Sequence, residues 1–358
     1  MVVTKESRIK GALLGVHAGD SLGATVEFNP WKTIQAKYPN GLRDIVGGGS
    51  FRWAPGAATD DTDLTRAVLL AYYDSAKHKK QGSDPQDSGS KGSDSLVQTA
   101  AKYMLDWYEG NNWPGRAKGR RPNDVGGATA TALSAFGKSR DPTKSGCGEG
   151  NAGNGSLMRC IATGLFQSDP QKLVEESEAI SKVTHGDSEC VISCAVYNVM
   201  VRELVGGKTP NEAWDAGMDL VNKMKEKENR NRNGYRYKAA AHIEKVLNGA
   251  KVVSLHDLAS NGPLKSANWK TELPFDASGY VLESLKLAVA AMLDERSLED
   301  VLVDVVRVGR DTDTNGAIAG GLLGARDGVE AIPPRWLEQL QFRNEFEEIV
   351  DYILGSAA

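Results

Sequence analysis

Residues 55–73 read PGAATDDTDLTRAVLLAYY, a loop that turns into a helix through a run of carboxylates. Pro55 and Gly56 favour the loop, and the apolar run beginning at Leu64 predicts the helix. Thr59 can cap that helix with its hydroxyl group. Carboxylates in the first turn are stabilised by the helix dipole by about 0.3–1 kcal/mol. An acidic helix cap alone would therefore explain much of this segment.

The crowding of the carboxylates favours a second explanation. Asp60, Asp61 and Asp63 fall within five residues, and two like charges about 4 Å apart repel by ~4 kcal/mol at an effective dielectric constant of about 20. A hard cation with oxygen ligands would relieve this repulsion, and Thr and Asp supply such ligands. The segment is thus either a simple cap or one part of a metal site.

A second Thr/Asp cluster lies near the C-terminus, in residues 309–325, GRDTDTNGAIAGGLLGA. Asp311 and Asp313 are two residues apart, so a helix entry can turn both carboxylates toward one point. Thr62 and Thr314 could add neutral oxygen ligands without adding charge. Two such clusters, each opening a helix of small and apolar residues, predict one metal site built from distant parts of the chain.

The apolar pattern predicts helices along most of the chain, and no alternating strand pattern or internal repeat is visible. Residues 8–24, RIKGALLGVHAGDSLGA, predict a helix with many glycines. Because each glycine costs up to ~1 kcal/mol in a helix, we expect tight packing or a ligand close to this backbone. Residues 29–58 are turn-rich and predict an irregular loop. The expected fold is all-α, with one compact domain spanning residues 1–358.

Two segments predict surface connections. Residues 77–94, KHKKQGSDPQDSGSKGSD, predict a flexible polar insertion between two helices. Residues 225–238 predict a charged, exposed connection. The basic patch Arg116–Arg121 fits either a solvated loop or contact with an anionic substrate.

Composition excludes several classes of protein. The 358 residues are 40% hydrophobic and 25% charged, which is typical of a soluble globular protein. A net charge of −4 argues against direct nucleic-acid binding. No signal sequence and no apolar run long enough to cross a membrane is visible, and the four cysteines do not suggest a disulfide framework. We expect a cytoplasmic protein without membrane contact, and a monomer.

A glycine-rich loop precedes the apolar segment 157–166, LMRCIATGLF, which we expect to be helical. Free backbone N–H groups in Gly153, Asn154, Gly155 and Ser156 would suit an anionic diphosphate or the adjacent ribose. A tight turn that needs glycine only for its backbone conformation is the alternative. The loop lacks the lysine of a P-loop and does not form a dinucleotide-binding fingerprint.

Six motifs follow one another along the chain: GDSLGATVEF, TDDTDL, NDVGGAT, GNGSLMR, THGD and GRDTDTNGAIAGGLLGA. Together they resemble the ADP-ribosylglycohydrolase family, and within it the branch of the dinitrogenase-reductase-activating glycohydrolase. The resemblance spans nearly the whole chain. It implies an all-α, single-domain fold with two magnesium or manganese ions at the base of a cleft, facing the distal ribose of ADP-ribose.

The resemblance also implies roles for individual residues. Glu27 corresponds to a glutamate near the metals and the scissile bond, and Asp124 to an aspartate implicated in proton transfer. The implied metal ligands are Thr59, Asp60, Asp61, Asp311, Asp313 and Thr314. The implied substrate-binding residues are Gly126, Gly127, Gly153, Asn154, Gly155, Ser156, Leu157, Met158 and, near the diphosphate, His185.

The expected activity is hydrolysis at the anomeric carbon of the distal ribose of an ADP-ribosylated protein or small molecule. Carboxylates that flank a glycosidic bond can do acid and base work, and oxygen-rich ligands suit magnesium or manganese better than zinc. Two alternatives remain open at the level of sequence. One is a phosphatase acting on ADP-ribose 1″-phosphate through the same metals, and the other is a non-catalytic binder of ADP-ribose.

Overall fold

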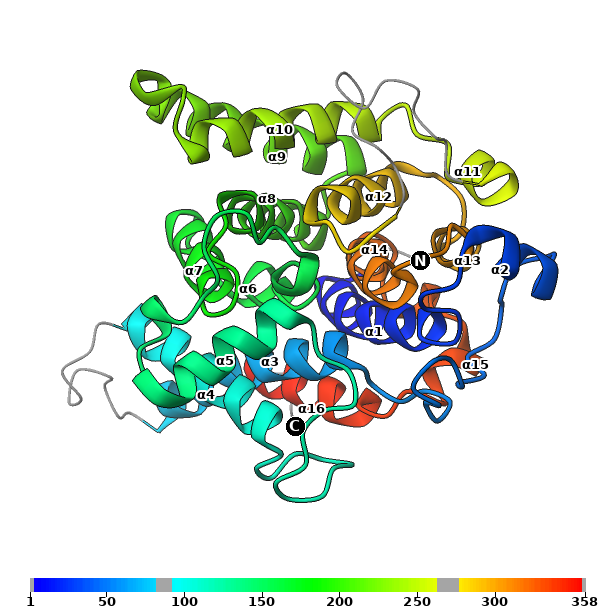
Figure 1. Ribbon diagram of the computed structural model, residues 1–358, viewed down its shortest axis with the longest axis horizontal. Helices are drawn as coiled ribbons and strands as arrows, with labels where there is room; N and C mark the ends of the chain where they lie inside the picture. The colour runs from blue at the N-terminus through cyan, green and yellow to red at the C-terminus, as the bar shows by residue number, and fades with distance from the viewer. Residues whose placement is uncertain (1–2, 82–91, 263–276, 356–358) are drawn as a thin grey trace.

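The computed structural model of the chain describes residues 3–81, 92–262 and 277–355, and its architecture is all-α, as expected (Figure 1). Within these ranges the β-type pairings are isolated bridges, such as the one between Pro30 and Gly309. The α-helices are α1 (Lys5–Gly23), α2 (Trp31–Lys37), α3 (Asp60–Lys80), α4 (Gly92–Glu109), α5 (Gly127–Ser139), α6 (Ile161–Phe166), α7 (Pro170–Lys182), α8 (Ser188–Val205), α9 (Pro210–Lys227), α10 (Tyr235–Ala250), α11 (Leu255–Asn261), α12 (Val281–Leu293), α13 (Leu298–Arg307), α14 (Thr312–Asp327), α15 (Pro334–Leu337) and α16 (Arg343–Leu354).

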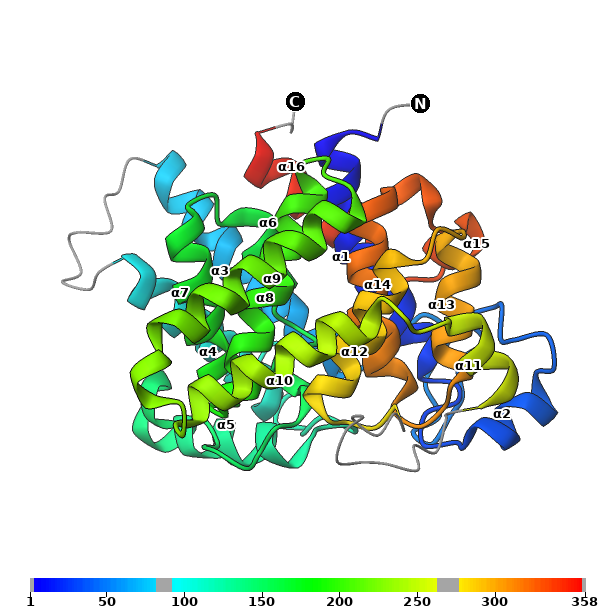
Figure 2. The ribbon, with the colours of Figure 1, turned by 90° about the horizontal axis from the view of Figure 1, so that it is seen from above.

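Helices α1 and α14 lie side by side at the centre of the molecule (Figure 1). Helices α8, α12 and α13 pack against α14, while α3 and α16 pack against α1. The central pair is buried along nearly its whole length. Figure 2 shows that the start of α1 and the end of α16 lie at one edge of the molecule, and Lys10 joins them through a 2.6 Å ion pair to Asp351.

Glycines set the distance between the two central helices. A Cβ atom placed on Gly15 would lie 2.1 Å from the carbonyl oxygen of Gly320, and one on Gly19 would lie 2.0 Å from that of Gly316. The same relation links Gly11 with Gly324, where a Cβ atom on Gly324 would lie 1.9 Å from the oxygen. Residue numbers rise on one helix as they fall on the other, so the helices are antiparallel. The glycines of residues 8–24 therefore serve tight helix packing.

This antiparallel register brings the end of α1 to the start of α14. The Thr312 hydroxyl donates to the carbonyl oxygen of Gly23 at 2.7 Å. Just beyond, the N–H of Phe28 donates to the Arg310 carbonyl at 2.7 Å, and the N–H of Arg310 donates to the Asn29 carbonyl at 2.8 Å. Two segments almost 300 residues apart in sequence are thereby held together at one end of the central pair.

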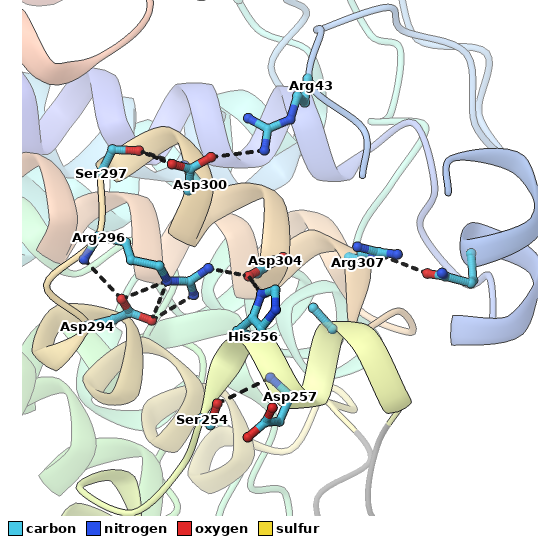
Figure 3. A network of polar contacts seen from close by, with 12 residues as sticks. Arg43, Ser254, His256, Asp257, Asp294, Arg296, Ser297, Asp300, Asp304 and Arg307 are labelled. Carbon is cyan, nitrogen blue, oxygen red and sulfur yellow. Dashed lines mark hydrogen bonds and ion pairs between the residues drawn. The ribbon is translucent and has the colours of Figure 1, made fainter. Parts of the chain in front are cut away.

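Helix α13 leads directly into the second Thr/Asp cluster, and polar contacts hold it in place (Figure 3). Arg296 forms 2.7 Å ion pairs with Asp294 and with Asp304 of α13. Arg43, from the loop after α2, pairs with Asp300 at 2.9 Å. The Ser297 hydroxyl caps α13 by accepting the N–H of Asp300 at 3.2 Å.

Three local expectations differ from the structure. The turn-rich region 29–58 contains helix α2, whose Trp31 indole donates to the Ala259 carbonyl at 2.8 Å. The polar insertion is shorter than 77–94, because α3 continues to Lys80 and α4 begins at Gly92; the segment 82–91 lies outside the described residues. The connection at 225–238 is also shorter, because α9 ends at Lys227 and α10 begins at Tyr235.

Among the described residues, every helix is too short or too polar to cross a membrane.

A substitution in the glycine contact tests whether the central pair carries the fold. In Gly15→Ala, the new methyl group meets main-chain atoms of α14 that cannot rotate away. Overpacking typically costs 1–3 kcal/mol, so we expect a loss of about 3 kcal/mol or more in the free energy of unfolding, measured by chemical denaturation.

Gly137→Ala in α5 is the matched control. Its Cβ atom would meet only ordinary neighbours, the closest being Leu105 Cδ1 at 3.5 Å. Alanine favours a helix over glycine by up to about 1 kcal/mol, so this variant should be as stable as the wild type or more so. Equal stability of the two variants would contradict the role of the glycine contact.

Candidate active site

A cavity of about 630 Å³ opens where α1 ends and where α3, α5 and α14 begin. One part of its wall is acidic and the other part consists largely of glycine backbone and one histidine. The acidic part comprises Glu27, Asp60, Asp124, Asp311, Asp313 and Thr314. The second part includes Gly126, Gly127, Gly153, Gly155, Met158 and His185. The cavity thus joins most of the side chains that the sequence singled out.

Three carboxyl groups form a compact cluster at the acidic end. One oxygen atom each from Glu27, Asp311 and Asp313 lies within 4.8 Å of the others. Glu27 Oε2 and Asp61 Oδ1 are buried and have no hydrogen-bond partner among the described residues. Buried polar atoms in proteins almost always have a partner. Unpartnered carboxylate oxygens beside a carboxylate cluster are what a site for a divalent cation requires.

Burial and mutual repulsion both favour the protonated forms of these acids when no cation is present. The pKa of Asp60, Asp61 and Asp313 is raised well above the ordinary value, first by burial and then by neighbouring carboxylates. Burial and the charges of Asp124 and Asp311 raise the pKa of Glu27 to about 8. Burial and the charge of Asp311 raise the pKa of Asp124 to about 6.

Asp20 is a further buried carboxyl group whose charge acts on Asp61 and Asp313, and its sequence motif did not point to it. Its Oδ2 atom accepts the N–H groups of Thr59 at 3.1 Å and Thr62 at 3.2 Å, and also the Thr62 hydroxyl. It therefore fixes the first turn of α3 onto α1. The available signal was a carboxylate within the small-residue stretch 18–24, AGDSLGA, at the end of the helix.

The first turn of α3 is divided between the cavity and the protein interior. Thr59 caps the helix, as predicted, and its hydroxyl also donates to Asp61 Oδ2 at 3.0 Å. The hydroxyl of Thr62 donates to Asp20, and the Thr62 side chain does not line the cavity. Asp63 faces away from the cluster and accepts the indole N–H groups of Trp107 and Trp113, each at 2.8 Å.

The glycine-rich loop is a 3₁₀ turn over Asn154–Ser156 and not the start of a long helix. Helix α6 begins only at Ile161, which corrects the expected helix start at residue 157. Asn154 donates from Nδ2 to Asp311 Oδ2 at 2.6 Å, so it positions a carboxylate of the cluster. The side chains of Ser156 and Leu157 are buried and do not line the cavity. Any contact these two residues make with a ligand would come from the backbone.

The other end of the cavity combines a helix start with a neutral histidine. Gly126 and Gly127 begin α5, whose first-turn N–H groups favour anions. His185 packs beside the loop, since a Cβ atom on Gly155 would lie 2.9 Å from its Cε1 atom. Burial and the nearby positive charge of Arg159 lower the pKa of His185 to about 3, so the ring is neutral at physiological pH.

A second groove, of about 840 Å³, adjoins the cavity and shares Asp60 and Asp124 with it. Its wall comes from the loop before α3 and from the loop between α4 and α5. Phe51 and Trp53 supply aromatic surface there, and the basic residues are Arg52, Arg116, Arg120 and Arg121. The two shared carboxyl groups thus lie where the cavity opens into the groove.

The fold and this site together define a class of protein. The family model described as ADP-ribosylglycohydrolase matches residues 1–358, and the chain belongs to the ADP-ribosylglycohydrolase family.

Individual relatives agree with this assignment. The chain is 27% identical over 354 residues to the ADP-ribosyl-[dinitrogen reductase] glycohydrolase of Rhodospirillum rubrum, with 98% of this chain and 96% of the relative covered. It is 25% identical over 352 residues to the ADP-ribosylarginine hydrolase Tri1 of Pseudomonas putida strain GB-1, with 98% and 78% covered. A solved structure described as an ADP-ribosylglycohydrolase-related protein complex superposes with a TM-score of 0.69 at 26% identity, covering 99% of each chain.

Substitutions at Asp20 test its role in holding the first turn of α3. Asp20→Ala leaves the buried N–H groups of Thr59 and Thr62 without their acceptor, which costs about 1–3 kcal/mol for each group. Asp20→Asn keeps one acceptor oxygen and should lose much less. Chemical denaturation in the presence of a chelator measures both.

The pH dependence adds a second readout. Burial raises the pKa of Asp20 in the folded protein to about 7, compared with about 4 in the unfolded chain. The protonated side chain therefore contributes its full stabilisation below about pH 4, and this contribution is lost as the pH rises through about 7. The deficit in the free energy of unfolding of Asp20→Asn relative to the wild type should therefore shrink between pH 6 and pH 8. A deficit that grows over this range would contradict the assignment.

Proposed function

We propose that the protein is a metal-dependent ADP-ribosyl hydrolase that cleaves the bond at the anomeric carbon of the distal ribose. One observation carries this proposal: a single cavity has clustered carboxyl groups at one end, and a helix start with a neutral histidine at the other. Its volume of about 630 Å³ falls within the usual range of about 300–1,000 Å³ for small-molecule sites. Membership of the family supports the same activity.

The two ends of the cavity suit the two ends of an ADP-ribosyl group. The N–H groups that begin α5, the backbone of Gly153 and Gly155, and the ring of His185 would hold the diphosphate, whereas the Asn154 N–H already donates to the Gly279 carbonyl at 3.0 Å. The ribose that carries the scissile bond would then lie toward Glu27 and the carboxyl cluster. A carboxyl group is a poor neighbour for a phosphate but a good acceptor for sugar hydroxyl groups, so the opposite orientation is disfavoured.

The residues at the acidic end fit bound divalent cations, because unpartnered buried oxygens stand beside the clustered carboxyl groups. The ligands would be Thr59, Asp60, Asp61, Asp311, Asp313 and Thr314, and this oxygen-only set favours two magnesium or manganese ions. Such ions, when bound, would orient the ribose hydroxyl groups and make a water molecule more acidic. Asn154 and Asp20 would keep the surrounding carboxyl groups and the first turn of α3 in place.

Glu27 and Asp124 are the proposed proton-transfer groups. Both line the cavity, and each has a raised pKa that brings its titration closer to neutral pH. Glu27 lies within the carboxyl cluster and would accept a proton from the attacking water. Asp124 lies where the cavity meets the groove and would hold a proton at the departing atom. Enzymes that cleave glycosidic bonds typically use two carboxyl groups that flank the scissile bond.

We further propose that the scissile linkage is to arginine. The leaving group would exit from the cavity into the groove, past Asp60 and Asp124. At this opening the carboxyl groups of Asp60 and Asp124 favour a guanidinium group and repel the dianion that a 1″-phosphate would release, whereas the arginines lie farther along the groove wall. Two relatives, of Pseudomonas putida and Serratia proteamaculans, are named as ADP-ribosylarginine hydrolases.

An assay of the pure protein with manganese or magnesium tests the activity and the linkage together. The substrates are ADP-ribose linked to arginine, to serine and to an acetyl group, and ADP-ribose 1″-phosphate. We expect release of ADP-ribose from the arginine-linked substrate at the highest kcat/KM. Fastest turnover of the 1″-phosphate would establish the phosphatase alternative, and binding of ADP-ribose without turnover of any substrate would establish the binder.

Metal titration of variants tests the proposed ligands. Mutating a residue that only hydrogen-bonds to a metal ligand typically lowers metal affinity about 10–100-fold. Asp313→Asn changes a proposed ligand itself, so calorimetric titration with manganese should show at least as large a loss of affinity. Glu27→Gln should keep most of the metal and lower kcat by ~10²-fold or more, as expected for a proton-transfer group. If Glu27→Gln loses metal as completely as Asp313→Asn, then Glu27 is a ligand.

Asp63→Asn is the matched control for this titration. Asp63 lies in the same short segment as Asp60 and Asp61, but its carboxylate binds two indole groups. A thermal melt shows whether Asp63→Asn is folded. If it is, its metal affinity should stay within a few fold of the wild type. Loss of metal in folded Asp63→Asn would show that charge in this segment matters more than ligand geometry.

A further inference from the structure

Arg159 is a buried cation that the proposed reaction does not use. Its side chain is fully buried behind the glycine-rich loop, and among the described residues no carboxylate forms an ion pair with it. Instead it donates to the Gly155 carbonyl at 2.5 Å, the Ile180 carbonyl at 3.2 Å and the Thr184 hydroxyl oxygen at 2.8 Å. Burying a charge without a counter-ion is costly, so a positive charge at this position requires an explanation.

The contact with Thr184 determines where one hydrogen atom lies. A guanidinium group only donates hydrogen bonds, so Thr184 Oγ1 accepts from Arg159. The same hydroxyl lies 2.8 Å from Nδ1 of His185. The hydroxyl oxygen could in principle accept from both groups, but its own hydrogen would then have no acceptor among the described residues; when that hydrogen points to Nδ1, every group in the chain of contacts is satisfied. That nitrogen is then the acceptor of the imidazole ring, and the ring hydrogen sits on Nε2.

The Nε2 atom faces the backbone that lines the cavity. A Cβ atom placed on Gly153 would lie 3.5 Å from it, and one on Gly155 would lie 3.3 Å from it. Among the hydrogen bonds of the described residues, the ring of His185 uses Nδ1 and not Nε2, and the ring lines the cavity. The backbone of His185 is fixed as well, because its N–H donates to the Ser181 carbonyl at 2.8 Å and its carbonyl accepts from the Ser181 hydroxyl at 3.0 Å.

We propose that Arg159 and Thr184 are positioning residues that hold His185 as the Nε2–H tautomer, so that the ring offers a neutral donor to an anionic ligand at the Gly153–Gly155 loop. The chemical class of that ligand is a diphosphate ester. This identification rests on the proposed function, whereas the tautomer rests only on the contacts within the protein. The buried charge of Arg159 adds a favourable potential for the same anion without touching it.

The tautomer can be measured in the free, full-length protein. Long-range ¹H–¹⁵N correlation spectra of histidine-labelled protein distinguish a ring nitrogen that carries hydrogen from one that does not. The chain has five histidines, and His185→Gln assigns the signal by its disappearance. We expect Nε2 of His185 to carry hydrogen and Nδ1 to be bare throughout pH 5–8. A hydrogen on Nδ1, or a protonated ring in this range, would overturn the proposal.

Variants at Thr184 test the link to Arg159. Thr184→Val removes both hydrogen bonds while keeping the side-chain shape, and Thr184→Ser keeps the hydroxyl. Thr184→Val should lose the single tautomer and bind ADP about tenfold more weakly, the loss expected for one hydrogen bond to a charged group. Thr184→Ser should restore both properties. Titration with ADP and with adenosine in metal-free buffer measures the effect, and only ADP binding should change.

His185→Gln provides a second route if Thr184→Val does not fold. A glutamine amide can place an N–H group near the position of Nε2, whereas His185→Phe cannot donate. We expect His185→Gln to keep ADP affinity within a few fold and His185→Phe to lose about tenfold. Equal ADP affinity in the two variants would overturn the donor role. Because ADP has no bond for this enzyme to cleave, failure of the hydrolase proposal would appear in the substrate assay alone.

Discussion

The direct contact between the backbones of α1 and α14 is the constraint on which the rest of the structure depends. Carbonyl oxygens of one helix occupy the places where side chains of the other would begin. This contact fixes the antiparallel register, so that Glu27 after α1 meets Asp311 and Asp313 at the start of α14. A shift by one turn would move one helix about 5.4 Å along the other and separate these carboxyl groups. The site is therefore built by helix packing before any loop contributes.

The acidic cluster is an unfavourable arrangement that the surrounding structure maintains. Carboxyl groups that are buried together repel one another and resist ionisation, as the raised pKa values of Asp60, Asp61 and Asp313 show. Neutral hydrogen bonds hold their frame: Asp20 fixes the first turn of α3, and Asn154 fixes Asp311. A bound cation would offset the repulsion among these buried carboxyl groups, which agrees with the proposed metal dependence.

The sequence predicted the helical class, the glycine-rich central helix and the two Thr/Asp clusters, because each depends on a local pattern. The resemblance to the family added Glu27, Asp124 and His185, which no local pattern would have brought together. Asp20 was missed because its role arises only when α3 packs on α1. Helix α2 was missed because it is short and lies between turn formers, Asn29-Pro30 before it and Pro39-Asn40-Gly41 after it, while contacts such as that of Trp31 with Ala259 stabilise it. The start of α6 was predicted too early, because an apolar run does not show which of its first residues still belong to the turn before the helix.

The two ends of the cavity must differ in charge and yet not attract each other. A lysine or a protonated histidine beside the glycine-rich loop would be drawn to the carboxyl groups across the cavity, and an ion pair could close the empty site. The protein instead lines that end with backbone N–H groups and with His185. Burial and the positive charge of Arg159 lower the pKa of His185 to about 3. The positive charge of Arg159 stays behind the loop, fixed by the Gly155, Ile180 and Thr184 oxygens. An anion can then experience that charge, while the charge itself cannot move into the cavity to meet the acids.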